Sequence, residues 1–169
     1  MSTAKILLED FDIEMAGARK TLERIPADKP AYAPHTKSMP MGRLAMHLAT
    51  MPLFGKYILT DPGMDLAAPI HPHESLEFTT SENLLATFDK GVAACRAALA
   101  AATDESLAQP WKFSFGEHPI SNDSRSLSYR RMFFNHFIHH RAQLGVYLRL
   151  NDVAVPGLYG PSADEPFTP

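Results

Sequence analysis

Two histidines near the end of the chain, His136 and His140, have the spacing of a helical metal site. They lie four residues apart within 135–149, a stretch with a strongly helical pattern. This spacing places both imidazoles on one face of a helix, one turn apart. Two such rings can hold one divalent ion if a third ligand comes from a facing helix. His47, which lies in an earlier helical pattern, is the candidate for that third ligand.

The apolar residues around this pair indicate which face of the helix it occupies. They recur at steps of three and four, which predicts that both histidines lie on the buried side. These residues are Tyr129, Phe133, Phe137, Leu144, Tyr147 and Leu148. Two buried neutral imidazoles each need a hydrogen-bond donor and an acceptor, whereas one metal ion satisfies the lone pairs of both. The alternative is a hydrogen-bonded pair in the core, and His47 taken alone is more typical of a core histidine bonded to a backbone carbonyl.

Four other histidines and the single cysteine are explained without a function. His35, His71 and His73 lie in proline-rich connections, which favours solvated loops. His139 is next to His140 but is turned by about 100° around the helix, so it does not compete for the same site. Cys95 lies on an apolar stripe and is expected to be an inert small hydrophobic residue.

The composition is that of one soluble globular domain spanning residues 1–169. A chain of 169 residues buries a substantial core without disulfides or a structural metal, so a metal here would serve function before folding. A net charge of -3 without a basic block makes nucleic acid an unexpected partner. One cysteine cannot form an internal disulfide, and neither an export signal nor a membrane span is indicated. These features favour a cytoplasmic location.

Four segments have the apolar periodicity of helices of about twenty residues. They are predicted at 3–24, 39–59, 81–103 and 126–150, the third with a capping box from Thr79 to Glu82 and the last ending at Asn151 as a left-handed cap. This pattern predicts an all-α fold, an up-and-down-like four-helix bundle with long connections and an irregular tail. Arg141 and Arg149 are expected to be solvated.

Two connections leave alternatives open. Residues 61–80 are polar and rich in proline, which is consistent with either a crossover or a lid between helices. In 111–115, aromatic residues alternate with polar ones, as in a single extended strand that covers the end of the bundle. An irregular aromatic plug would have the same pattern.

Three stretches of the sequence carry a family resemblance. The second helical segment contains Gly42-Arg43-Leu44-Ala45-Met46-His47-Leu48-Ala49, the last contains residues 135–149, and the tail contains Val155-Pro156 and Tyr159-Gly160-Pro161-Ser162-Ala163-Asp164. Together they resemble the DinB family of damage-inducible, metalloenzyme-like proteins, and the resemblance covers the whole chain. One departure is Ala142, where members often have glycine.

The resemblance implies a four-helix bundle, often a homodimer, that holds a divalent metal. Carried over to this sequence, the ligands would be His47, His136 and His140, and the ion would be zinc or nickel. Some members of the wider superfamily are transferases or isomerases that depend on low-molecular-weight thiols such as bacillithiol or mycothiol. A small molecule would then be the substrate, with such a thiol as a further cofactor.

The residue after His136 narrows the range of reactions. Phe137 stands where the helical metalloprotease motif has a glutamate, so a general base is missing from this helix and proteolysis is disfavoured. Three histidines on a metal leave a position for water or a thiolate, as in catalytic sites. The leading hypothesis is a metal-dependent transferase or hydrolase acting on a small molecule, with no catalytic residue identified. The competing hypothesis is a non-catalytic, metal-binding stress-response homodimer.

Overall fold

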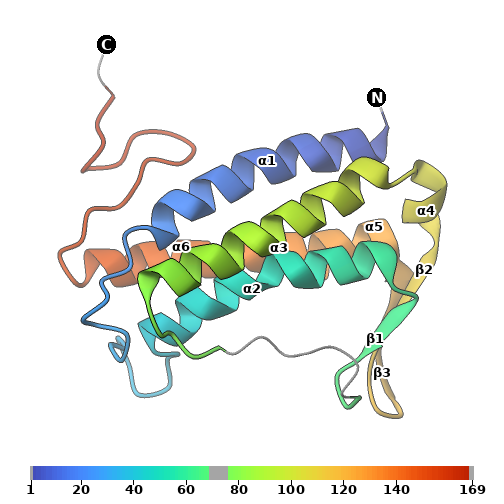
Figure 1. Ribbon diagram of the computed structural model, residues 1–169, viewed down its shortest axis with the longest axis horizontal. Helices are drawn as coiled ribbons and strands as arrows, with labels where there is room; N and C mark the ends of the chain where they lie inside the picture. Colours follow the sequence, from blue (N-terminus) through green and yellow to red (C-terminus); the bar gives the residue numbers. More distant parts are fainter. Residues whose placement is uncertain (1, 69–75, 168–169) are drawn as a thin grey trace.

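Long helices that lie side by side form most of the molecule (Figure 1). The computed structural model describes residues 2–68 and 76–167. The helices are α1 (Thr3–Leu22), α2 (Met41–Thr60), α3 (Ser81–Ala101), the short α4 (Asp104–Ala108) and a last helical stretch made of α5 (Arg125–Ser128), the π-helix η1 (Tyr129–Phe134) and α6 (Asn135–Arg149). The four predicted helical segments are therefore present, with ends within about two residues of the sequence-based bounds.

The chain is mostly helical, as predicted, but a small sheet departs from the all-α prediction. Its strands are β1 (Gly63–Asp65), β2 (Pro110–Phe115) and β3 (His118–Ser124), in the order β1-β2-β3. β1 is parallel to β2 and pairs Met64 with Phe113, while β2 is antiparallel to β3. Gly116, with φ +56, makes the turn between β2 and β3, a conformation that glycine adopts without steric cost. The interpretation of 111–115 as a strand is thus confirmed, but its partners were not foreseen.

The sequence did not predict strands β1 and β3, for a physical reason. β1 has only three residues, and β3 is a mostly exposed polar segment without hydrophobic alternation. In β2, by contrast, Trp111 and Phe113 are buried on either side of the exposed Lys112. Pairing of β1 with β2 joins parts of the chain nearly fifty residues apart, which no local pattern encodes.

Aromatic rings join the helices in the core. Phe133 lies 6.3 Å from Phe11 of α1 and 5.8 Å from Phe137 of α6, measured between ring centroids. Phe137 in turn stacks at 6.4 Å on Phe88 of α3. All four rings are fully buried. One aromatic cluster therefore fixes α1, α3, η1 and α6 relative to one another.

Two helix caps differ by one residue from the sequence-based expectation. Thr80, not Thr79, caps α3, and its hydroxyl accepts a hydrogen bond from the backbone N–H of Asn83. After α6, the left-handed residue is Asp152, with φ 57, and not Asn151. Asp tolerates this conformation nearly as well as Asn, so the neighbouring position satisfies the same requirement.

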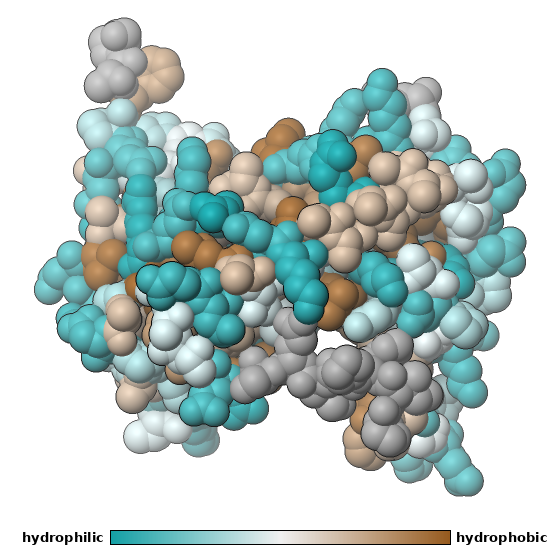
Figure 2. Space-filling view, viewed as in Figure 1, coloured by the Kyte–Doolittle hydropathy of each residue, from teal (hydrophilic) through white to brown (hydrophobic). Residues whose placement is uncertain are grey.

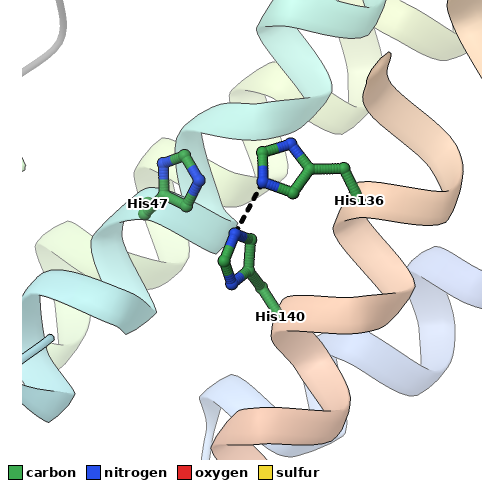
Figure 3. Close-up of side chains that lie close together, drawn as sticks. All are labelled: His47, His136 and His140. Atoms are coloured by element: carbon green, nitrogen blue, oxygen red, sulfur yellow. Dashed lines mark hydrogen bonds between the residues drawn. The ribbon is translucent and has the colours of Figure 1, made fainter. Parts of the chain in front are cut away.

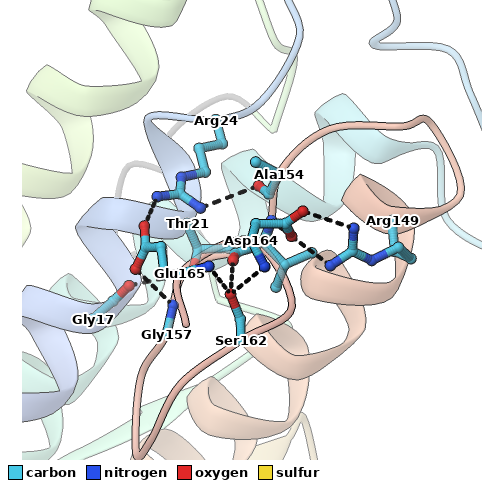
Figure 4. Close-up of polar contacts among 10 residues, drawn as sticks. Gly17, Thr21, Arg24, Arg149, Ala154, Gly157, Ser162, Asp164 and Glu165 are labelled. Carbon is cyan, nitrogen blue, oxygen red and sulfur yellow. Dashed lines mark hydrogen bonds and ion pairs between the residues drawn. The ribbon is translucent and has the colours of Figure 1, made fainter. Parts of the chain in front are cut away.

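The C-terminal tail is held by ion pairs at the end of the molecule opposite the sheet (Figures 1 and 4). Arg149 of α6 pairs with Asp164, with 2.5 Å between Nη2 and Oδ2. Arg24, just after α1, pairs with Glu165 and donates to the carbonyl oxygen of Ala154 at 3.2 Å. The tail thus connects the ends of α1 and α6.

Arg141 is buried, contrary to the expectation of a solvated side chain. It is 3% exposed, and its Nη1 lies 2.5 Å from Oε2 of Glu14 on α1. The guanidinium also donates to the backbone carbonyl of Glu14 at 3.2 Å and to the hydroxyl of Tyr159 in the tail. That hydroxyl donates to the Glu14 carboxylate at 2.8 Å. The prediction failed because Arg141 was assigned by residue type, although it continues the apolar stripe through Phe137.

The surface is mixed in character. On the face shown in Figure 2, hydrophilic residues are interspersed with hydrophobic ones. Within residues 2–68 and 76–167, no helix is both long and apolar enough to cross a membrane. Of the connection 61–80, residues 61–68 contain β1, and residues 76–80 lead into α3. The predicted loop histidines His71 and His73 lie outside the described residues.

Candidate metal centre

Packing of α2 against α6 brings His47, His136 and His140 together. In Figure 3 the three imidazoles point toward one another across the space between the two helices. The ring centroids of His47 lie 5.5 Å from His136 and 4.8 Å from His140, and the latter two are 4.5 Å apart. One nitrogen from each ring lies within 4.8 Å of the others. This cluster has the size and donor set of a three-histidine site for one divalent ion.

Hydrogen bonds behind the rings determine which nitrogen faces the cluster. Nδ1 of His140 lies 2.7 Å from the side-chain oxygen of Gln143, and Nδ1 of His136 lies 3.4 Å from the backbone carbonyl of Met132. Oxygens of this kind only accept, so in a neutral ring each Nδ1 carries the proton. Both Nε2 lone pairs then point into the cluster, in the orientation that outer hydrogen bonds give to metal-ligating histidines.

The distance between those two lone pairs favours a shared cation. Nε2 of His136 and Nε2 of His140 are 2.7 Å apart. With the proton of each neutral ring on Nδ1, neither Nε2 donates, so the two lone pairs repel at this distance. A divalent ion placed among the three rings would use all of these lone pairs at once. The residues present therefore fit a metal.

Electrostatics favour the neutral, ligating form of the rings. Burial lowers the pKa of His47 to about 4, and the neighbouring His140 and His136 contribute to this shift. Burial also lowers the pKa of His140, against the opposing effect of the hydrogen bond to Gln143. Since only neutral histidine binds a metal, both side chains are ready to ligate at neutral pH.

The cluster is less buried than the sequence indicated. His140 is 8% exposed and His47 is half-buried, but His136 is exposed. Phe137 and Leu144 lie on the face of α6 that packs in the core, and the two histidines lie on the adjacent face. The prediction that both lie on the buried stripe is therefore wrong for His136. Its position opens the cluster to one side.

On that open side lies a cavity of about 830 Å³ that has His47 and His136 in its wall. Helix α2 contributes Phe54, the sheet contributes Phe113, and η1 contributes Met132. A volume of this order is typical of sites for small molecules, which are mostly apolar with few polar groups. A metal held by the three histidines would therefore face a space that can admit a ligand.

Among the described residues that line this cavity, the carboxylate is Asp65. It accepts hydrogen bonds from the backbone N–H groups of Ala67 at 2.9 Å and Gly116 at 2.8 Å. These two bonds lower the pKa of Asp65. A carboxylate stabilised in its charged form is a weaker base than an unperturbed one.

The other predicted side chains take no part in the cluster. His139 is exposed and has its ring 5.1 Å from that of His140, and His35 is exposed in its loop. Cys95 is buried, and burial raises the pKa of its thiol to about 12, as expected for an inert cysteine. Gln143 was missed by the sequence analysis. Its position three residues after His140 places it within reach on the same helix, so the spacing contained the signal.

Comparison with known proteins agrees with this architecture. Residues 1–167 match the DinB family. The chain belongs to the DinB family. The DinB-like protein YjoA of Bacillus subtilis is 22% identical, with a TM-score of 0.68 over 89% of this chain and 96% of that one. A DinB-like protein of Bacillus cereus is 21% identical, with a TM-score of 0.64 over 90% of this chain and 95% of that one.

At these identities the two structures establish a shared fold only. No curated protein matches the chain significantly. Membership of the DinB family and the cluster of three histidines are both compatible with metal binding.

Proposed function

We propose that this DinB-family protein is a metal-dependent enzyme that acts on a small molecule, as a thiol-dependent transferase or a hydrolase. His47, His136 and His140 bind the ion, and zinc or nickel fits their nitrogen donors. The observation that carries the proposal is that three imidazoles converge and that two of them, His47 and His136, line a cavity of about 830 Å³. A closed structural site would have a fourth protein ligand in place of this opening.

Besides binding the ion, the chain's own residues have two roles in such a site. Gln143 and the carbonyl of Met132 orient the rings of His140 and His136 through their Nδ1 protons. The apolar wall, including Phe54 and Phe113, displaces water from a bound substrate. When bound, the ion supplies a Lewis-acidic centre with an open coordination position. A low-molecular-weight thiol is the co-substrate that we propose, because zinc accepts thiolate sulfur.

The test is a turnover assay with the metal-loaded protein. Common bacterial thiols are offered together with electrophiles, and hydrolysis of simple esters and amides is measured in parallel. The proposal expects turnover that is lost in His47→Ala and retained in His139→Ala, because only His47 belongs to the cluster. Equal rates in the two variants would show that the turnover does not come from this site.

A non-catalytic, metal-binding stress-response protein is the second candidate. The observation in its favour is that Asp65, the carboxylate in the described cavity wall, is already occupied by two backbone N–H groups. This candidate predicts tight metal binding together with the absence of turnover for every class of substrate.

We further propose a cytoplasmic homodimer. The single, buried and reduced Cys95 suits a reducing compartment. Exposed apolar side chains on α6 and the tail, namely Val146, Leu150 and Leu158, provide a surface that a second copy would cover. Light scattering tests the assembly, and a mass near the 18.7 kDa chain at all micromolar concentrations would contradict it.

A further inference from the structure

We propose that the cavity beside the histidine cluster selects ligands with one anionic, metal-binding head on an extended apolar body, without a second charge. This inference rests on the proposed metal site and names the class of small molecule that the site takes. Its basis is the lining of the cavity, the state of its charged residues and the position of the cluster.

The lining is apolar and adaptable. Apolar residues contributed by α2, the sheet and η1 form most of the wall, among them Met51, Leu53, Phe54, Met64, Phe113 and Met132. Three of these six are methionines, whose flexible, polarizable side chains adjust to ligands of different shape. A hydrophobic chain placed here would exchange contact with water for contact with these side chains.

The charged residues in the described wall are already compensated. Asp65 accepts two backbone hydrogen bonds, and Nη1 of Arg131 pairs with Oδ2 of Asp123 at 3.2 Å. The side chain of Arg131 is 60% exposed, so water screens its ion pair. A second ligand charge placed away from Arg131 would have to replace a backbone partner of Asp65 or stay unpaired in an apolar space, and both cost binding free energy. The apolar part of the ligand is therefore expected to be uncharged.

The remaining charge in the cavity would come from the metal. Three neutral histidines do not offset the charge of a divalent ion, so the open position attracts an anion. His47 and His136 lie in the cavity wall, which places this position at the cavity and not on the outer surface. One anionic head thus binds at the metal while its apolar body occupies the cavity.

The fluorescence of the tryptophan can report the binding of such a ligand. Trp111, the only tryptophan, stacks on Phe113 at 5.4 Å and contacts the edge of Phe54 at 6.0 Å between ring centroids. Both phenylalanines line the cavity. A ligand that displaces these rings will change the tryptophan fluorescence.

The experiment is a titration of the metal-loaded protein with straight-chain hydroxamates from acetohydroxamate to octanohydroxamate, monitored by calorimetry and by Trp111 fluorescence. All members have the same metal-binding head, so only the apolar body varies. Affinity should rise by about fourfold for each added methylene that is buried. An octano-length hydroxamate with a terminal carboxylate should bind more weakly than the uncharged one. Equal affinity along the series, or tighter binding of the doubly charged member, would overturn the inference.

Two variants locate the effect. The test variant is Leu66→Asp, which places a charge at a residue that lines the cavity and is 42% exposed. Ile13→Asp on α1, where the side chain is 65% exposed outside this lining, is the matched control. Leu66→Asp should reduce the dependence on chain length, and Ile13→Asp should leave it intact. An equal loss in both variants would show that the chains bind elsewhere.

A metal-free arm separates this inference from the proposed function. The apolar wall remains without the ion, so octanohydroxamate should still change the fluorescence of Trp111, at higher concentration, while acetohydroxamate should not. Failure to bind metal combined with this result would refute the proposed function and leave the apolar cavity supported. Metal binding without any effect of chain length would refute only the inference.

Discussion

Adjacent residues of α6 face two regions of opposite character. Arg141 is buried, and its charge is met by the Glu14 carboxylate, the Glu14 carbonyl and the Tyr159 hydroxyl. His140 faces a cluster in which two Nε2 lone pairs are 2.7 Å apart. Opposite charges and donors are matched in the first region, whereas like acceptors are gathered in the second. The first arrangement is complete in the folded chain, and the second needs a cation to complete it.

This difference separates folding from ligand binding within one helix. Substitutions in the Arg141 region should lower the free energy of unfolding without a specific effect on metal. Substitutions in the histidine cluster should lower metal affinity while the fold persists, because the aromatic core at Phe133 and Phe137 does not depend on the ion. Variants in the Arg141 region, variants in the histidine cluster and a change of pH can therefore test the two regions separately.

The largest effect is expected from Arg141→Met. The substitution leaves the Glu14 carboxylate buried without its cation, which should lower the free energy of unfolding by about 3–5 kcal/mol. Urea denaturation monitored by circular dichroism measures this loss. The double variant Glu14→Leu/Arg141→Met removes both charges and should recover a large part of it. A loss below about 1 kcal/mol in the single variant would mean that the pair behaves like a surface ion pair.

Replacing a proposed metal ligand comes next. His140→Ala removes one of three donors and should reduce metal affinity by more than the roughly 10–100-fold typical of outer hydrogen-bond partners. His139→Ala, one residue away and exposed, is the control and should bind normally. Competition with a chelating dye gives both affinities. Similar values for the two variants would assign the ligands to other residues.

Substitutions of Gln143 test whether its hydrogen bond to His140 orients the ring for metal binding. Gln143→Ala removes the acceptor of the His140 Nδ1 proton and should reduce metal affinity by about 10–100-fold. Gln143→Glu keeps an acceptor at the same position and should bind at least as tightly as the original chain. The same dye competition applies to both variants. An affinity for Gln143→Ala equal to that of the unaltered protein would show that the hydrogen bond does not orient His140.

A smaller effect is expected from pH on the metal-free protein. The pKa of His47 is lowered to about 4 in the folded state, mainly by burial, from an unperturbed value near 6.5. Between these values the unfolded chain binds more protons, so stability should fall as the pH falls from about 6.5 to 4 and be unaffected by His47 above that window. Urea midpoints measured across the window test this. His47→Gln should flatten the slope, and His139→Ala should not.

The smallest effect is expected for Arg149→Met, at the exposed pair with Asp164. Water and salt screen this pair, so the loss of stability should be far smaller than in Arg141→Met and should shrink further in high salt. Thermal unfolding at low and high salt compares the two variants. Equal losses would remove the distinction between the buried and exposed ion pairs.

The sequence predicted the elements that depend on local pattern. Helical periodicity located all four helical segments, and the spacing of His136 and His140 with the helix around His47 identified the cluster. The two pairing partners of β2 were missed because strand pairing is non-local. The π-helical turn at Tyr129–Phe134 has no distinct compositional signal, and it was read as ordinary α-helix.

Other misses were within reach of the sequence. Glu14 and Arg141 both lie on otherwise apolar stripes, and two opposite charges in such positions indicate a buried ion pair. The exposure of His136 could not be read from periodicity, because it depends on a cavity formed by α2, the sheet and η1.

An open metal site formed by three histidines can be tested by titrating the metal-free protein with Co²⁺ while recording absorbance and helicity. We expect one ion per chain, a spectrum that changes on adding azide or a small thiol, and helicity that is largely kept when the ion is removed. His47→Ala should abolish the tight phase. A spectrum indifferent to every small ligand, together with unfolding on removal of the ion, would mean a closed structural site and would contradict the open site.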